Sequence, residues 1–182
     1  MRIHFIAIGG AIMHSLAIEL KNNGHIVSGS DDVIYEPSRS NLIFHKILPK
    51  QIGWFKSNIN KSIDLVILGM HARKDNVELL EAKKLKLNIV SFPEYIYQYA
   101  QNKKRIVVAG SHGKTTITAM ILHVLNDCNM RVDYLLGAKI NLLNNLVQLQ
   151  NNSSIIIEGD EYFSSSIDRQ PKFMYYQPDI LV

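Results

Sequence analysis

Apolar and polar positions follow one another along the first half of the chain as expected for strands that alternate with helices. Residues 2–8, 25–28, 64–68 and 88–91 are short apolar segments of strand length. Between them, residues 11–21 and 76–86 carry apolar side chains at helical spacing, and Asn76 is a suitable N-cap for the second helix. Such an order predicts a parallel sheet with helices on both faces. We therefore expect an α/β fold that begins with a Rossmann-like unit.

The same order of elements starts again after residue 103. A helix that begins near Pro93 and a polar connector at residues 101–104 come first. Strand patterns then cover residues 105–108, 131–136, 154–158 and 179–182, and a helical pattern covers 117–128. We place one domain at residues 1–103 and the start of a second at 104–182. Because an α/β nucleotide domain usually has about 100–150 residues, we expect the second domain to be incomplete.

The second unit opens with a glycine-bounded loop between an apolar strand and a helix. The loop and the first helical turn consist of Gly110, Ser111, His112, Gly113, Lys114, Thr115 and Thr116. Backbone N–H groups in such a loop converge on phosphate, Lys114 supplies a positive charge, and the Thr115 hydroxyl can hold Mg²⁺. The spacing is shorter than in the usual P-loop, and an ordinary turn is the alternative. The strand and helix on either side favour a P-loop that binds a nucleoside triphosphate with Mg²⁺, with Lys114 as a candidate catalytic residue.

An acidic cluster follows the apolar strand at 154–158. Glu158, Asp160 and Glu161 stand where a carboxylate can face bound phosphates. Mg²⁺ prefers oxygen ligands, and Glu158 together with Thr115 would provide them, so Glu158 is a candidate catalytic residue and metal ligand. The alternative is a solvated acidic turn.

Another glycine turn follows the first strand. Gly9, Gly10 and Ala11 join that strand to its helix, and Asp31 follows the next strand about 20 residues later, where an acidic residue can meet a ribose hydroxyl. The dinucleotide fingerprint G-x-G-x-x-G is not satisfied. A plain Rossmann turn and a nucleotide-binding loop both remain open.

Three of these segments resemble the Mur ligases: Gly-Ser-His-Gly-Lys-Thr-Thr at 110–116, Ile-Gly-Gly-Ala-Ile-Met at 8–13 and Glu-Gly-Asp-Glu-Tyr at 158–162. The resemblance implies that the first domain binds the UDP of UDP-N-acetylmuramate and that Glu158 binds the metal. It further implies a set of substrate-binding residues, in which Gly9, Gly10, Ala11 and Met13 line the diphosphate, Ser30 and Asp31 lie near the ribose or uracil, and Asp160 and Glu161 organise the muramoyl side.

Within the family, residues 35–38, 69–76 and 91–94 are most similar to the murein peptide ligases, which attach a recovered peptide to UDP-N-acetylmuramate. The L-alanine ligases are the nearest alternative. The resemblance implies an ATP-dependent ligase that forms an amide bond between UDP-N-acetylmuramate and an amino acid or peptide. Because the chain is well under half of such a ligase, we expect it not to complete the reaction alone. A nucleotide-binding remnant without catalysis and an NAD-dependent oxidoreductase are the other interpretations.

Composition excludes several other classes of function. The chain of 182 residues has a net charge of +4, and its lysines form short groups rather than a stripe interleaved with aromatic residues, so we expect no nucleic acid partner. No apolar run has membrane-spanning length and no signal peptide is evident, which predicts a cytoplasmic protein without membrane insertion. The single cysteine, Cys128, falls on the apolar face of the helix at 117–128, where we expect it to be packed in the core.

Overall fold

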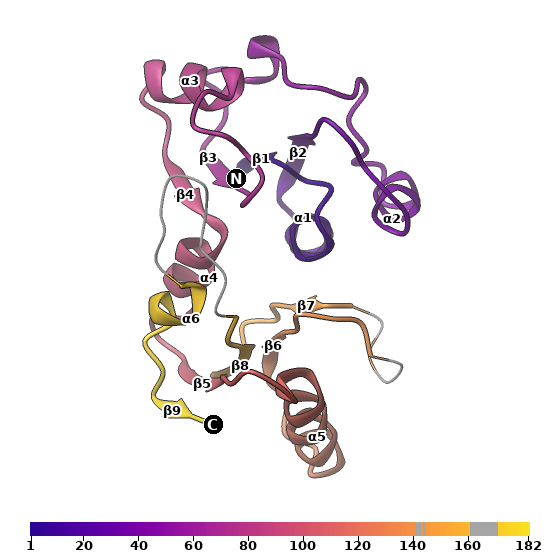
Figure 1. Cartoon of the computed structure of the whole chain (residues 1–182), viewed down its shortest axis with the longest axis vertical. Helices are drawn as coiled ribbons and strands as arrows, with labels where there is room; N and C mark the ends of the chain where they lie inside the picture. The colour runs from indigo at the N-terminus through magenta and orange to yellow at the C-terminus, as the bar shows by residue number, and fades with distance from the viewer. Residues whose placement is uncertain (141–142, 144, 161–170) are drawn as a thin grey trace.

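The computed structural model describes residues 1–140, 143, 145–160 and 171–182. The strands form two sheets, which lie one above the other in Figure 1. The first has the order β2-β1-β3-β4 and is parallel throughout, with β1 at Arg2–Ile6, β2 at Ile26–Ser30, β3 at Leu65–Leu68 and β4 at Ile89–Ser91. The predicted Rossmann-like first unit is thus confirmed.

The second sheet has the order β7-β6-β8-β5-β9. Its strands are β5 at Lys104–Val108, β6 at Asp133–Leu135, β7 at Val147–Gln148, β8 at Ser154–Glu158 and β9 at Ile180–Leu181. The short β7 runs antiparallel to β6, and the other neighbours are parallel. The carboxyl ends of β5 and β8 are adjacent, since Val108 pairs with Glu158. This register places the predicted phosphate-binding loop, which follows β5, and the predicted metal ligand Glu158 at the same carboxyl edge of the sheet.

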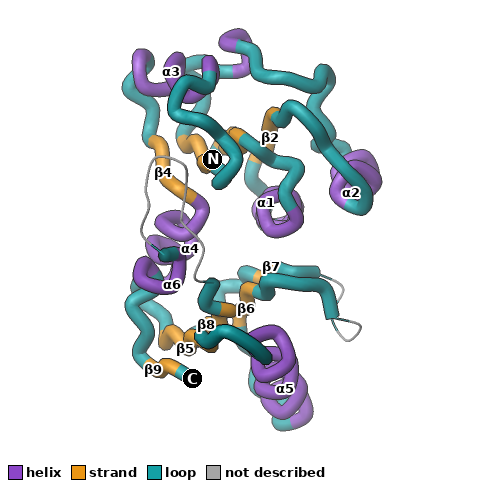
Figure 2. Tube along the Cα trace, viewed as in Figure 1, coloured by secondary structure: helices purple, strands orange, loops and turns teal. Residues whose placement is uncertain are grey.

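Helices connect the strands of both units. They are α1 at Ala11–Asn22, α2 at Ser38–Phe44, α3 at Val77–Lys84, α4 at Phe92–Ala100, α5 at Lys114–Asp127 and α6 at Lys172–Tyr175, with a 3-10 helix at Lys56–Asn58. The Asn76 side chain accepts hydrogen bonds from the N–H groups of Glu78 and Leu79, which confirms the predicted N-cap of α3. Figure 2 shows that most of the chain between α2 and β3 is loop. None of the described helices has the length and apolar character needed to cross a bilayer.

Side chains of α1 and of its C-cap, Asn23, join the first unit to the second through the backbone of Leu149. The Leu149 N–H donates to the Glu19 carboxylate at 2.7 Å, and the Asn23 amide donates to the Leu149 carbonyl at 2.7 Å. Burial at this contact raises the pKa of Glu19. The backbone N–H and carbonyl of Leu149, a loop residue of the second unit, are therefore both hydrogen-bonded to the first unit. A continuous apolar cluster also runs from α1 into the second sheet.

The prediction that Cys128 is packed in the core is wrong, because Cys128 is exposed at the end of α5. The helix packs on its sheet through Thr118 and Leu122, which are both buried. Met120 and Val124, on the side of the helix that carries Cys128, are 63% and 58% exposed. The apolar face read from the sequence is thus divided between the core and the surface.

Candidate nucleotide-binding sites

The loop between β5 and α5 contains two glycines in conformations that a phosphate-binding loop would need. Gly110 and Gly113 have φ values of 141° and 77°, a region that favours glycine, and Gly113 is the N-cap of α5. The Lys114 amine lies inside the loop and donates to the Gly110 carbonyl at 2.6 Å. Ser111, His112 and Thr116 are exposed beside it. A cation and a helix N-terminus therefore converge on one open loop, as anion binding requires.

Glu158 lies beside this loop at the carboxyl end of β8. Its side chain is buried and accepts two hydrogen bonds, from the Thr115 hydroxyl to Oε1 at 2.8 Å and from the Gly137 N–H to Oε2 at 2.9 Å. The structure thus brings together the two residues that the sequence predicted as metal ligands. Gly137, which follows β6, is a partner that the sequence did not reveal.

The oxygens of Thr115 and Glu158 fit one Mg²⁺ ion. Two ligands at adjacent positions of an octahedral magnesium site lie about 3 Å apart, and these oxygens are separated by 2.8 Å. Among the described residues, no group of three His, Cys, Asp or Glu side chains is placed to hold a metal on its own. The remaining ligands would have to come from phosphate and water, as is usual for Mg²⁺ bound with a nucleotide.

Asp160, two residues after Glu158, accepts hydrogen bonds from residues of α6. Its carboxylate accepts a hydrogen bond from the Lys172 amine at 2.8 Å, and its carbonyl accepts one from the Phe173 N–H at 3.2 Å. The other predicted muramoyl contact, Glu161, lies outside the described residues.

At the first sheet, Asp31 closes over the glycine turn. Its carboxylate accepts hydrogen bonds from the N–H of Gly9 at 2.6 Å and from the N–H of Asp32 at 3.0 Å. Burial raises the pKa of Asp31 to about 6, although both N–H groups act in the opposite direction. A Cβ on Gly9 would lie 2.8 Å from the Asp31 carboxylate, whereas a Cβ on Gly10 would have no neighbour closer than 3.8 Å. Gly9 is thus required by the fold, and Gly10 leaves room for a ligand.

The other residues predicted for the UDP site, Ala11, Met13 and Ser30, differ in their exposure. Ala11 is exposed at the start of α1, whereas Met13 is buried in the core. Ser30 is fully buried, and its hydroxyl donates to the carboxylate of Glu78. Glu78 also accepts hydrogen bonds from the Phe55 N–H and from the side chain of Asn58. The side chain of Ser30 therefore points into a buried polar network rather than toward the open edge of the sheet.

A cavity of about 300 Å³ lies over the carboxyl edge of the first sheet. Asp32, which follows β2, and His71, which follows β3, line it from either side of β1, and Trp54 and Arg73 complete much of the wall. In open parallel sheets, ligands bind outside the carboxyl ends of the strands where the strand order reverses, and β1 and β3 flank that point here. The cavity is therefore placed where a nucleotide is expected.

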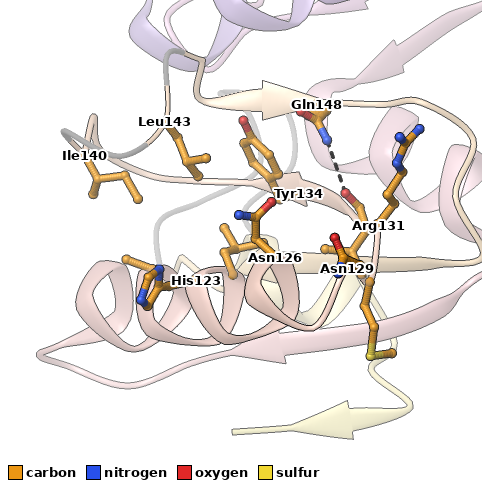
Figure 3. Close-up of a pocket in the computed structure, with 12 residues that line it drawn as sticks. His123, Asn126, Asn129, Arg131, Tyr134, Ile140, Leu143 and Gln148 are labelled. Carbon is orange, nitrogen blue, oxygen red and sulfur yellow. Dashed lines mark hydrogen bonds between the residues drawn. The ribbon is translucent and has the colours of Figure 1, made fainter.

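A cavity of about 530 Å³ lies elsewhere, between α5 and the β6–β7 hairpin (Figure 3). His123, Asn126, Tyr134 and Gln148 are among its lining residues, and none of residues 110–116 lines it. It lies along the second half of α5, where the helix dipole favours cations rather than phosphate. It is therefore distinct from the predicted ATP loop.

Comparison with known protein families assigns the chain to a family. The profile described as "Mur ligase family, catalytic domain" matches residues 2–104, which is more than half of the sequence. The chain belongs to the Mur ligase family. The expected family is thus confirmed.

Individual Mur ligases match almost all of the chain. It is 32% identical over 171 residues to the "UDP-N-acetylmuramate--L-alanine ligase" of Caldicellulosiruptor saccharolyticus, covering 93% of this chain and 37% of that protein. It is 29% identical over 183 residues to the "UDP-N-acetylmuramate--L-alanyl-gamma-D-glutamyl-meso-2,6-diaminoheptandioate ligase" of Escherichia coli, covering 100% of this chain and 40% of that protein. The chain therefore spans less than half the length of these relatives.

A solved Mur ligase has the same fold. The crystal structure of the UDP-N-acetylmuramate:L-alanyl-gamma-D-glutamyl-meso-diaminopimelate ligase from Neisseria meningitides superposes with a TM-score of 0.88 at 27% identity, covering 99% of this chain and 59% of that chain. Mur ligases with either amino acceptor are thus similar to this chain.

Proposed function

We propose that the chain is the nucleotide-binding part of an ATP-dependent ligase that forms an amide bond between UDP-N-acetylmuramate and an amino acid or peptide. The observation that carries the proposal is the convergence of Lys114, Thr115 and Glu158 at the carboxyl edge of the second sheet. The chain has a separate glycine turn at the carboxyl edge of the first sheet. The printed names of the relatives, which are UDP-N-acetylmuramate ligases, support the same substrate.

The second unit, residues 104–182, is proposed to hold the triphosphate. Formation of an amide from a carboxylate and an amine requires activation of the carboxylate. Phosphoryl transfer from ATP would supply it, and for that step the protein contributes mainly charge stabilisation and alignment. Residues 110–116 would surround the phosphates, and the Lys114 amine would exchange the Gly110 carbonyl for a phosphate oxygen. A bound Mg²⁺ would neutralise phosphate charge, and Thr115 and Glu158 would hold it.

The first unit, residues 1–103, is proposed to hold the UDP group. Gly10 and Ala11 offer an unobstructed backbone at the N-terminus of α1, which suits a diphosphate. The cavity over the carboxyl edge of the same sheet, with Asp32 and His71 on its walls, suits the nucleoside. Asp31 and Gly9 would shape this turn from within, and Asp160 would contribute to the muramoyl side of the site.

The acceptor is proposed to be a murein peptide, because residues 69–76 resemble that branch and the Neisseria ligase covers nearly the whole chain at a TM-score of 0.88. L-alanine is the second candidate, favoured by the 32% identity to the Caldicellulosiruptor enzyme.

Calorimetric titration of the full chain with UDP-N-acetylmuramate and, separately, with NADH tests the first site. We expect the UDP-sugar to bind and NADH not to bind. Gly10→Val should weaken UDP-sugar binding at least about tenfold without loss of the fold, because Gly10 has a φ of −62° and no close neighbour. A preference for NADH, or unchanged UDP-sugar affinity in the Gly10→Val variant, would contradict the proposal.

A further inference from the structure

We propose that Gly137 is a positioning residue for the metal site, and that this position requires glycine because the carboxylate of Glu158 lies against its Cα. The inference rests on the proposed binding of Mg²⁺ with ATP and adds to it a residue that follows a different strand, β6, outside both predicted motifs.

The fold holds Gly137 next to Glu158. Leu135 in β6 pairs with Ile157 in β8, so the residues that follow these strands run side by side. The Leu136 N–H donates to the Leu146 carbonyl at 2.8 Å and fixes the chain one residue before Gly137. Gly137 therefore reaches the carboxyl edge of the sheet on the side of Glu158 that faces away from β5.

The two carboxylate oxygens of Glu158 have different partners. Oε2 accepts the Gly137 N–H at 2.9 Å, and Oε1 accepts the Thr115 hydroxyl at 2.8 Å. A hydroxyl can turn its proton away and offer a lone pair to a cation, whereas a backbone N–H can only donate. When a cation binds, the bond from Gly137 can persist and hold Oε2, which leaves Oε1 directed at the site beside Thr115.

Space, rather than backbone conformation, explains why glycine stands here. A Cβ on Gly137 would lie 2.7 Å from Oε1 and 3.0 Å from Cδ of Glu158, while the φ of Gly137 is not in the left-handed region. Any residue except proline could donate the N–H, but only glycine allows the carboxylate to approach this closely. An alanine would displace the Glu158 carboxylate from its present position beside Thr115 and Gly137, and since Gly137 is exposed, the fold can accommodate the change.

Mn²⁺ binding in the presence of ATP, followed by electron paramagnetic resonance on the full chain, tests the proposal without any turnover. Substitutions of groups that orient a metal ligand typically cost about 10–100-fold in metal affinity, so we expect Gly137→Ala to weaken Mn²⁺ binding by at least about tenfold. Ala138→Ser, which adds one atom to the exposed neighbour, should leave Mn²⁺ binding within about twofold of the wild type.

A shorter acid provides the decisive comparison. Glu158→Asp withdraws the carboxylate by one methylene, so Gly137→Ala should cost less than about twofold in an E158D background, in contrast to its effect on the wild type. Equal losses in both backgrounds, or wild-type Mn²⁺ affinity in Gly137→Ala, would overturn the role of Gly137. If Glu158→Gln also left Mn²⁺ binding unchanged, the metal site itself, and with it that part of the proposed function, would be wrong.

Discussion

The adjacent glycines of the first turn differ in their surroundings, and this difference predicts that the same substitution destabilises the protein at position 9 and not at position 10. Alanine at position 9 would place a Cβ 2.8 Å from the Asp31 carboxylate and 3.1 Å from both the Ile34 side chain and the Val33 carbonyl. Alanine at position 10 would place its Cβ 3.8 Å from the nearest atom, in Met13. Neither glycine has a positive φ, so space alone separates the two variants.

The magnitudes follow from the cost of overpacking. Forcing an extra methyl group into a well-packed site costs about 1–3 kcal/mol, and two of the three close atoms at Gly9 cannot move independently of the backbone or of the 2.6 Å bond between Gly9 and Asp31. We therefore expect Gly9→Ala to lower the free energy of unfolding by about 2 kcal/mol. Gly10→Ala should stay within about 0.5 kcal/mol of the wild type, because the change adds a methyl group to open space and reduces the entropy of the unfolded chain.

Urea denaturation followed by circular dichroism measures both variants. At an m-value of about 2 kcal/mol/M, the expected loss moves the midpoint of Gly9→Ala about 1 M lower, with m unchanged. The distinction between a structural Gly9 and a ligand-accessible Gly10 would be refuted by equal midpoints, or by a larger loss for Gly10→Ala.

Three further predictions concern charges and caps. Burial raises the pKa of Asp31 from 3.8 to about 6, so the folded state binds the carboxyl proton more tightly than the unfolded state does. As the pH rises from about 4 to 7, ionisation of Asp31 therefore lowers the free energy of unfolding of the wild type by up to about 3 kcal/mol. Asp31→Asn should gain stability relative to the wild type over that range in urea titrations, and a constant difference would contradict this. The Lys103 amine lies 3.2 Å from the buried Asp133 carboxylate, and Lys103→Met would leave that carboxylate without its cation. We expect Lys103→Met to lower the free energy of unfolding by about 3 kcal/mol in thermal unfolding, and Lys104→Met, at an exposed position, by less than about 0.5 kcal/mol. Similar losses in the two variants would contradict a stabilising ion pair between Lys103 and Asp133. Asn76→Ala should cost about 1 kcal/mol and Asn76→Ser much less, and equal losses would exclude a capping role.

The sequence was sufficient for the elements whose signals are local. The apolar run of β3 is buried along its whole length, and Asn76 caps α3 with its own side chain. The glycines of the phosphate loop have the positive φ values that such a loop needs. The helix α2 was not predicted, because the residues at 38–44 bury little and Phe44 is 80% exposed, which leaves a weak periodic pattern.

Contacts between distant segments could not be read from the sequence. Gly137 meets Glu158 because β6 lies beside β8, and Glu78 meets Ser30 because α3 packs near the carboxyl end of β2. Pairing order and register decide such contacts, and neither leaves a local signature. The prediction that Cys128 is buried was wrong for a related reason. Apolar residues at helical spacing show which side chains share a face of the helix, but they do not show what covers that face.

ATP binding by the full chain with excess Mg²⁺ tests the proposed triphosphate site most directly. It is measured by titration calorimetry for the wild type, Lys114→Ala and Lys104→Ala. Lys104 lies at the amino end of β5, away from the loop, and Lys114 lies within it. We predict ATP binding by the wild type and by Lys104→Ala, and at least about a tenfold loss for Lys114→Ala, since a hydrogen bond to a charged group contributes about 1.5–3 kcal/mol. ATP affinity that is unchanged in a folded Lys114→Ala protein would contradict the binding of the triphosphate by residues 110–116.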